Sequence, residues 1–199
     1  MKNYIQVINF LQNVLVGGSV FFLMTSPLMQ NFYPELLPAQ YVSTLFFISL
    51  LSVTFVMAIR PLSDLLPRLR WLRSLIILRK GFGVVSASII VSFILSKMIH
   101  IGVFEYLAPW GTLTYWSLDG FALLAHLSDI TAIILLITSN NFSKRILGKN
   151  WKRVQKLAYV YFYCGALYVV LAFGNMFAVT SLIFVTLLVF LASLKKHYT

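Results

Sequence analysis

The sequence predicts an all-α integral membrane bundle of six transmembrane helices, with both termini on the cytoplasmic side. Composition is the first observation behind this prediction, since 60% of the 199 residues are hydrophobic and only 11% are charged. A soluble domain of this length cannot bury so much apolar surface, so lipid is the favoured solvent. The second observation is that the apolar residues gather in six separate runs. The third is that nearly all the cations lie between these runs.

The six apolar runs form a single transmembrane domain that covers residues 1–199. A helix rises about 1.5 Å per residue, so roughly 20 residues cross the ~30 Å hydrocarbon core of a bilayer. The predicted spans are about 5–24, 41–59, 81–101, 121–138, 157–173 and 177–194.

The first predicted span contains Gly17 and Gly18. Small residues of this kind predict that a neighbouring helix approaches closely there. Three prolines, Pro27, Pro34 and Pro38, mark the loop that leads to the second span.

The later connections also carry membrane signals. Segment 60–80 is basic and contains Trp71 and several leucines, which predicts a short helix on the membrane surface. Segment 100–120 is rich in aromatic residues that suit the headgroup level. Segment 139–156 is a second basic loop, in which Gly148 is typical of a helix C-cap.

The cations predict the orientation of the bundle. Of the 16 Lys and Arg residues, only Lys97 lies outside the N-terminus, the two basic loops and the C-terminal tail. The positive-inside rule therefore places these four segments in the cytoplasm. The opposite side carries three acidic residues, Glu35, Glu105 and Asp119. We interpret the net charge of +11 as a topology signal and as attraction to anionic lipid, so the bilayer is the expected partner and nucleic acid is not.

Several classes of chemistry lack their sequence signatures. The single cysteine, Cys164, excludes an internal disulfide and a CxxC motif. The chain contains no P-loop, HExxH or GxSxG motif, and no metal site is predicted. No soluble segment is long enough for a flavin or nucleotide domain, so a reductase function would need a separate partner chain.

Two predicted spans carry ionisable groups at membrane depth. Phe93, Lys97 and His100 follow one another at i, i+4 and i+7, which places them on one face of the third span. Asp129 lies halfway along the fourth span, three residues after His126. A charge at this depth costs a few kcal/mol, so Asp129 should face the bundle, with Lys97 as its first expected partner and His126 as the second. The cluster of Lys97, His126 and Asp129 is either a proton or ion relay, a polar site for a quinone or partner, or an internal ion pair. The charge match of Lys97 favours the ion pair.

Two stretches resemble the ferric-reductase-like transmembrane family. They are AIRPLSDLLPRLRWLRSLIILRKGFGVV at 58–85 and ITSNNFSKRILGKNWKRVQKLAYVYF at 137–162. The shared features are RP after the second span, paired cations before a glycine in the third, TS ending the fourth, and LGKxW before the fifth. The resemblance covers about residues 40–175.

The resemblance implies a six-span fold that holds b-type haem between histidines and passes electrons across the membrane from a flavin or quinone. One ligand position lies in the third span and two lie in the fifth, about thirteen residues apart. The matching residues here are Phe93, Gln155 and Tyr168. None is histidine, and no histidine occurs in residues 139–196. The resemblance therefore implies the fold but not the usual cofactor.

Three functional hypotheses follow. The first is a haem-free member of this group in the bacterial inner membrane, acting as a structural or partner-binding membrane subunit. The second is an electron-transfer subunit that holds one b-type haem through His100 and His126, with Tyr168 as a further ligand. The third is a small transporter or proton relay that uses Asp129, Lys97 and His126.

Overall fold

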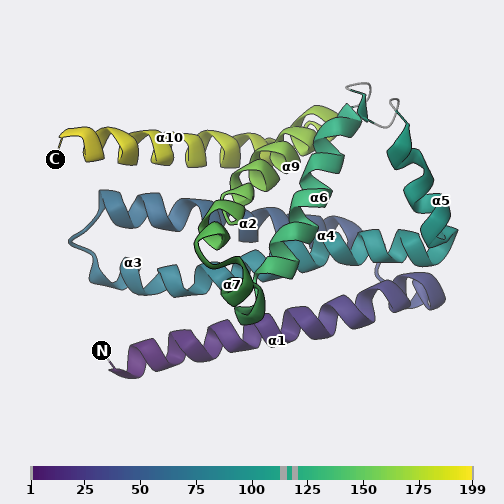
Figure 1. Ribbon diagram of the computed structural model, residues 1–199, viewed down its shortest axis with the longest axis horizontal. Helices are drawn as coiled ribbons and strands as arrows, with labels where there is room; N and C mark the ends of the chain where they lie inside the picture. Colours follow the sequence, from purple (N-terminus) through teal and green to yellow (C-terminus); the bar gives the residue numbers. More distant parts are fainter. Residues whose placement is uncertain (1, 113–115, 118–120, 199) are drawn as a thin grey trace.

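The computed structural model describes residues 2–112, 116–117 and 121–198, and all regular structure in these ranges is helical (Figure 1). Asp119, one of the three acidic residues expected outside, lies beyond the described residues. The six longest helices are α1 (Lys2–Phe32), α2 (Tyr41–Leu65), α4 (Arg79–Ile101), α6 (Ala122–Thr138), α9 (Leu157–Phe173) and α10 (Met176–Tyr198). The short α-helices between them are α3 (Arg70–Leu75), α5 (Val103–Leu107), α7 (Asn141–Leu147) and α8 (Trp151–Val154). The described residues also form the 3-10 turns η1 (Pro34–Leu36), η2 (Ile76–Leu78), η3 (Ala108–Gly111) and η6 (Gly148–Asn150).

Each of the six predicted spans corresponds to one of the long helices. The helices differ, however, in whether they are long and apolar enough to cross a membrane. Four candidate spans are long and apolar enough to cross a membrane, Tyr4–Phe32, Tyr41–Leu65, Trp71–Ile101 and Met176–Lys196. A fifth is reached only if α6 is joined to the segment Asn141–Val154 across a bend of 95°. The helix α9 has 17 residues, or about 25 Å of helix, which is short for a span. The structure thus has the features of an all-α, multi-pass membrane protein, and the arrangement with six spans and cytoplasmic termini stays a prediction.

The helix α4 lies at the centre of the molecule. It packs against α1, α2 and α6, while α9 packs against α6 and α2, and α10 covers α2 and α9. Figure 1 shows α1, α2, α4 and α10 extended along the long axis, with the pair α6 and α9 crossing them. The candidate site lies at this crossing, between α6, α9, the N-terminal half of α2 and the C-terminal half of α4.

The contact between α1 and α4 forms at a glycine, though not at the predicted ones. A Cβ atom built on Gly81 of α4 would lie 3.0 Å from Cδ1 of Leu15 in α1. Around Gly17 and Gly18, in contrast, no described atom lies within 4 Å of such a Cβ. The predicted close approach at Gly17 and Gly18 is therefore wrong, because the face of α1 that meets α4 carries Leu15 and the glycine sits on the partner helix.

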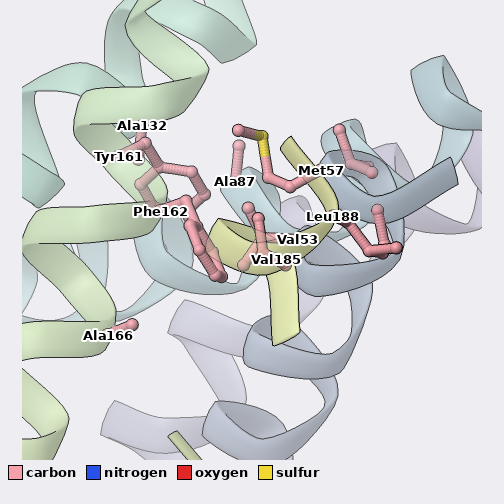
Figure 2. Packing of buried hydrophobic residues seen from close by; sticks show 11 residues of the cluster. Val53, Met57, Ala87, Ala132, Tyr161, Phe162, Ala166, Val185 and Leu188 are labelled. Carbon is pink, nitrogen blue, oxygen red and sulfur yellow. The ribbon is translucent and has the colours of Figure 1, made fainter. Parts of the chain in front are cut away.

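The core joins five helices. Its buried apolar side chains come from α2, α4, α6, α9 and α10 and include Val53, Met57, Ala87, Ala132, Phe162, Ala166, Val185 and Leu188 (Figure 2). Serines are unusually common among the buried residues of the same helices. Small hydroxyl side chains let membrane helices approach closely and bond across the interface, which lipid-facing leucines cannot do.

Candidate functional site: a charged cavity between four helices

A cavity of about 180 Å³ lies between α2, α4, α6 and α9. Its walls are mostly apolar and aromatic, and Phe46, Phe93, Phe162 and Tyr168 contribute rings to them. Two charged side chains also line it, Lys97 from α4 and Asp129 from α6. The cavity therefore brings together four of the residues singled out from the sequence, Phe93, Lys97, Asp129 and Tyr168.

Asp129 faces this cavity without a direct partner. The carboxylate makes no hydrogen bond with any described residue, and its distance to the Lys97 ammonium exceeds the 4.0 Å of an ion pair. Lys97 is exposed near the C-terminal end of α4, while Asp129 is half-buried in the middle of α6. The expected partners thus line the same cavity without forming an ion pair.

The position that the resemblance assigns to a third-span ligand is occupied by an aromatic stack. The Phe93 ring lies parallel to that of Phe46, with centroids 4.8 Å apart and an angle of 6° between the rings. Tyr168, the second of these positions on the cavity, packs edge-on against Phe173 at 5.8 Å. Rings therefore stand at two of the positions that the resemblance matches to haem ligands.

A network of buried hydroxyl groups lies beside the cavity. The Tyr161 hydroxyl lies 2.7 Å from Oγ of Ser86 and 3.3 Å from Oγ of Ser49, and the two serine oxygens are 2.9 Å apart. Ser86 also donates to the backbone oxygen of Ser49 at 2.9 Å. Ser49 and Tyr161 line the cavity, so this network forms part of its wall. The sequence analysis missed these three residues, although serines inside apolar helices were a usable signal.

Lys97 connects this cavity to a second, more open pocket. That outer pocket has a volume of about 590 Å³ and lies among the end of α1, η1, the start of α2 and the end of α4. Lys97 and His100 both line it, together with the amide side chains of Gln30 and Asn31. Asn31 holds α1 to α4 by donating to the backbone oxygen of Ser96 at 3.1 Å and to its Oγ at 2.9 Å.

The two histidines proposed as haem ligands lie in different surroundings. His100 lines the outer pocket, whereas the His126 ring packs edge-on against Trp116 with centroids 6.2 Å apart. His126 precedes Asp129 by three residues, which turns its side chain by about 60° around the helix. This rotation directs His126 toward the connection before α6, so it does not share the cavity with Asp129 and Lys97.

Gln155, the third position that the resemblance matches to a haem ligand, is also away from the cavity. Its Nε2 donates to Oγ1 of Thr138 at 3.4 Å, at the end of α6 opposite to the site. Trp151 bonds to the backbone oxygen of the same threonine at 3.0 Å. Gln155 therefore helps to fasten α8 to α6.

The remaining chemistry of the described residues is limited. They include no group of three or more His, Cys, Asp or Glu side chains placed to hold a metal ion. Cys164 is a half-buried free thiol. Comparison with family models, with curated proteins and with solved structures gave no match to this chain.

Proposed function

We propose that this chain is a haem-free membrane subunit of the ferric-reductase-like group, located in the bacterial inner membrane, with a structural or partner-binding role. One observation carries the proposal. Phe93 and Tyr168, which the resemblance matches to ligand positions in two different spans, line a single small cavity and fill its walls with rings. This agrees with the spatial arrangement expected of the group and also with the loss of its cofactor.

The residues around the cavity do not fit haem. Phenylalanine has no donor atom for iron, and a lone tyrosine would make an unusual b-type site. His100 and His126 do not face a common cavity, and Gln155 bonds to Thr138. The electron-transfer hypothesis therefore has little geometric support.

The proposed orientation follows from the cations. The helix ends near α3, α7, α8 and the C-terminus carry the basic side chains, which favour the cytoplasmic, anionic face of the membrane. The outer pocket and the site would then open toward the periplasmic side.

The hypothesis of a proton relay through Asp129 stays a prediction. It would require a polar route from the cavity to the basic side of the molecule. Val53, Phe162 and Ala166 belong to the hydrophobic core and line the cavity. An apolar floor of this kind supports a site with access from one side more than a conducting path.

A visible spectrum tests the haem-free proposal. The chain is expressed with haem supplied and purified in detergent, and a pyridine haemochrome assay then measures bound haem. We expect far less than one haem per chain. A stoichiometric Soret band that disappears in His100→Ala or His126→Ala would overturn the proposal and restore the electron-transfer hypothesis. A control variant, Tyr159→Phe, changes an exposed residue outside the cavity and should leave the spectrum unchanged.

A further inference from the structure

Asp129 and Lys97 present opposite charges to the same cavity. Asp129 has no hydrogen-bond partner among the described residues, and Lys97 forms no ion pair with it. An unpartnered charge inside a membrane protein costs several kcal/mol, and the half-buried Asp129 carries such a cost in the ligand-free chain. A bound molecule that carries both complementary charges would neutralise Asp129 and Lys97 at the same time.

The other walls restrict what the rest of such a molecule can be. Between the charges the surface is formed by rings and aliphatic side chains, including Phe93, Phe162 and Tyr168. The Tyr161 hydroxyl already bonds to Ser86 and Ser49 and has little capacity left for a ligand. The body of the ligand should therefore be apolar, with its polar groups confined to the two ends.

The volume sets the size of the ligand. An engineered apolar cavity of about 150 Å³ accepts one benzene molecule. The cavity here measures about 180 Å³. A branched aliphatic side chain is smaller than a benzene ring, which leaves room for two small charged groups near the walls.

Lys97 is common to the two pockets, since it lines both the cavity and the outer pocket of about 590 Å³. A molecule that enters from the outer pocket would therefore pass the Lys97 side chain before it reaches Asp129. Its cationic end would have to enter ahead of its anionic end.

We propose that this cavity binds a small zwitterion of the size of an aliphatic amino acid, with its ammonium group on Asp129 and its carboxylate on Lys97. The inference deepens the proposed function and rests on it, because the same space must be free of haem. It assigns the site a ligand class that matches its charges, walls, volume and access.

Ligand-induced stabilisation tests this assignment on the full chain in lipid nanodiscs. Thermal denaturation is followed with millimolar L-alanine, L-leucine or L-phenylalanine, and with two half-charged analogues of leucine, isoamylamine and isocaproate. A ligand that binds only the folded state raises the denaturation temperature by mass action. We expect leucine to do so, and each analogue to need at least about tenfold more ligand for the same shift, because each lacks one charge-assisted contact.

Two variants identify the contacts. In Asp129→Asn, leucine should act no better than isocaproate, and in Lys97→Gln no better than isoamylamine. Matched controls are Glu105→Gln and Lys80→Gln, which remove an exposed charge of the same sign away from the cavity and should keep the preference for leucine. A merely structural role of Asp129 or Lys97 would change stability without changing this preference.

The outcomes are distinguishable. If the purified chain is haem-free but no zwitterion shifts its denaturation, or the half-charged analogues act as well as leucine, the ligand assignment is overturned and the proposed function stands. If the chain carries stoichiometric haem, the proposed function fails first. The comparison of analogues on the unmodified chain decides the question even where a variant does not fold.

Discussion

Among single residues, Tyr161 best illustrates how polar groups are accommodated in this interior. Its ring is buried in the core and its hydroxyl bonds to Ser86 and Ser49, so all three helices α2, α4 and α9 meet at one hydrogen-bonded point. In the low dielectric of a protein interior a hydrogen bond is stronger than in water, and a polar atom without a partner is correspondingly more costly.

Removing the Tyr161 hydroxyl should weaken the junction of α2, α4 and α9. Tyr161→Phe deletes two hydrogen bonds and leaves Ser86 with its bonds to Ser49 alone. We expect a loss of about 1 kcal/mol in the free energy of unfolding, measured by denaturation in detergent. The matched control is Tyr159→Phe, since Tyr159 is 43% exposed on the same helix. Equal effects of the two substitutions would show that the hydroxyl network contributes nothing to stability.

Asp129 is the residue at which stability and the proposed binding oppose each other. In the ligand-free chain its carboxylate is half-buried and has no partner within reach. Asp129→Asn removes this unpaired charge, so it should stabilise the ligand-free chain by about 1 kcal/mol and raise its denaturation temperature. Asp64→Asn, at an exposed aspartate, is the control. A lower denaturation temperature for Asp129→Asn would instead identify the internal ion pair with Lys97.

At the scale of elements, the interfaces between helices depend on where small residues face a neighbour. Gly81 of α4 contacts Leu15 of α1, and Gly165 of α9 lies so close to α6 that an added Cβ would be 2.8 Å from Oγ of Ser128. Lysine side chains act at the ends of helices, where Lys195 of α10 donates to the backbone oxygens of Asp64 at 3.1 Å and Leu65 at 2.9 Å. That contact satisfies carbonyl groups left open at the end of α2.

Enlarging Gly81 should separate α1 from α4. The added atoms of Gly81→Val meet Leu15 Cδ1 and Cβ at 3.0 and 3.2 Å, and overpacking of this kind costs about 1–3 kcal/mol. The control is Gly17→Val, because no described atom lies within 4 Å of the corresponding position. Thermal denaturation of the two variants in the same detergent compares them directly. A larger effect at Gly17 would contradict the contact at Gly81.

At the scale of the whole molecule, the cations are concentrated in the connections and the tail. They lie at the end of α2, in α3, at the start of α4, in α7 and α8 and at the end of α10, whereas Glu35 and Glu105 lie in η1 and α5. A bilayer with an anionic inner leaflet converts this asymmetry into a preferred orientation.

Labelling of single cysteines tests the predicted orientation. In a Cys164→Ala background, a cysteine introduced by Glu105→Cys should react with a membrane-impermeant maleimide on intact spheroplasts. A cysteine introduced by Lys152→Cys should react only after permeabilisation. Both positions are exposed, so access through the membrane is the variable. Reaction of the Lys152→Cys variant from outside would exclude the model with six spans and cytoplasmic termini.

The helical class and the positions of the six apolar helices were predictable from the sequence. Lipid favours long apolar runs with cations between them, whichever helices later pack against one another. The depth and spacing of Lys97, Asp129 and Phe93 in the apolar runs singled them out, and the resemblance singled out Tyr168; all four line the cavity. The sequence could not identify Tyr161, Ser49 and Ser86 as a unit, since hydrogen bonds between distant helices leave no periodic trace.

Sequence by itself thus determined that the chain is helical, that its long helices are apolar enough for lipid, and which ionisable groups these helices carry. Only the tertiary structure decided which of those groups meet. Helical periodicity places Asp129 and His126 about 60° apart around the axis of α6, which leaves open whether they face the same space. The packing of α6 against α4 and α9 decides that they do not. Asp129 faces the cavity with Lys97, whereas His126 packs against Trp116. Packing also decided the length of α9 and the bend after α6. From the sequence alone, an apolar segment of about seventeen residues can be a short span or a helix that crosses its neighbours obliquely.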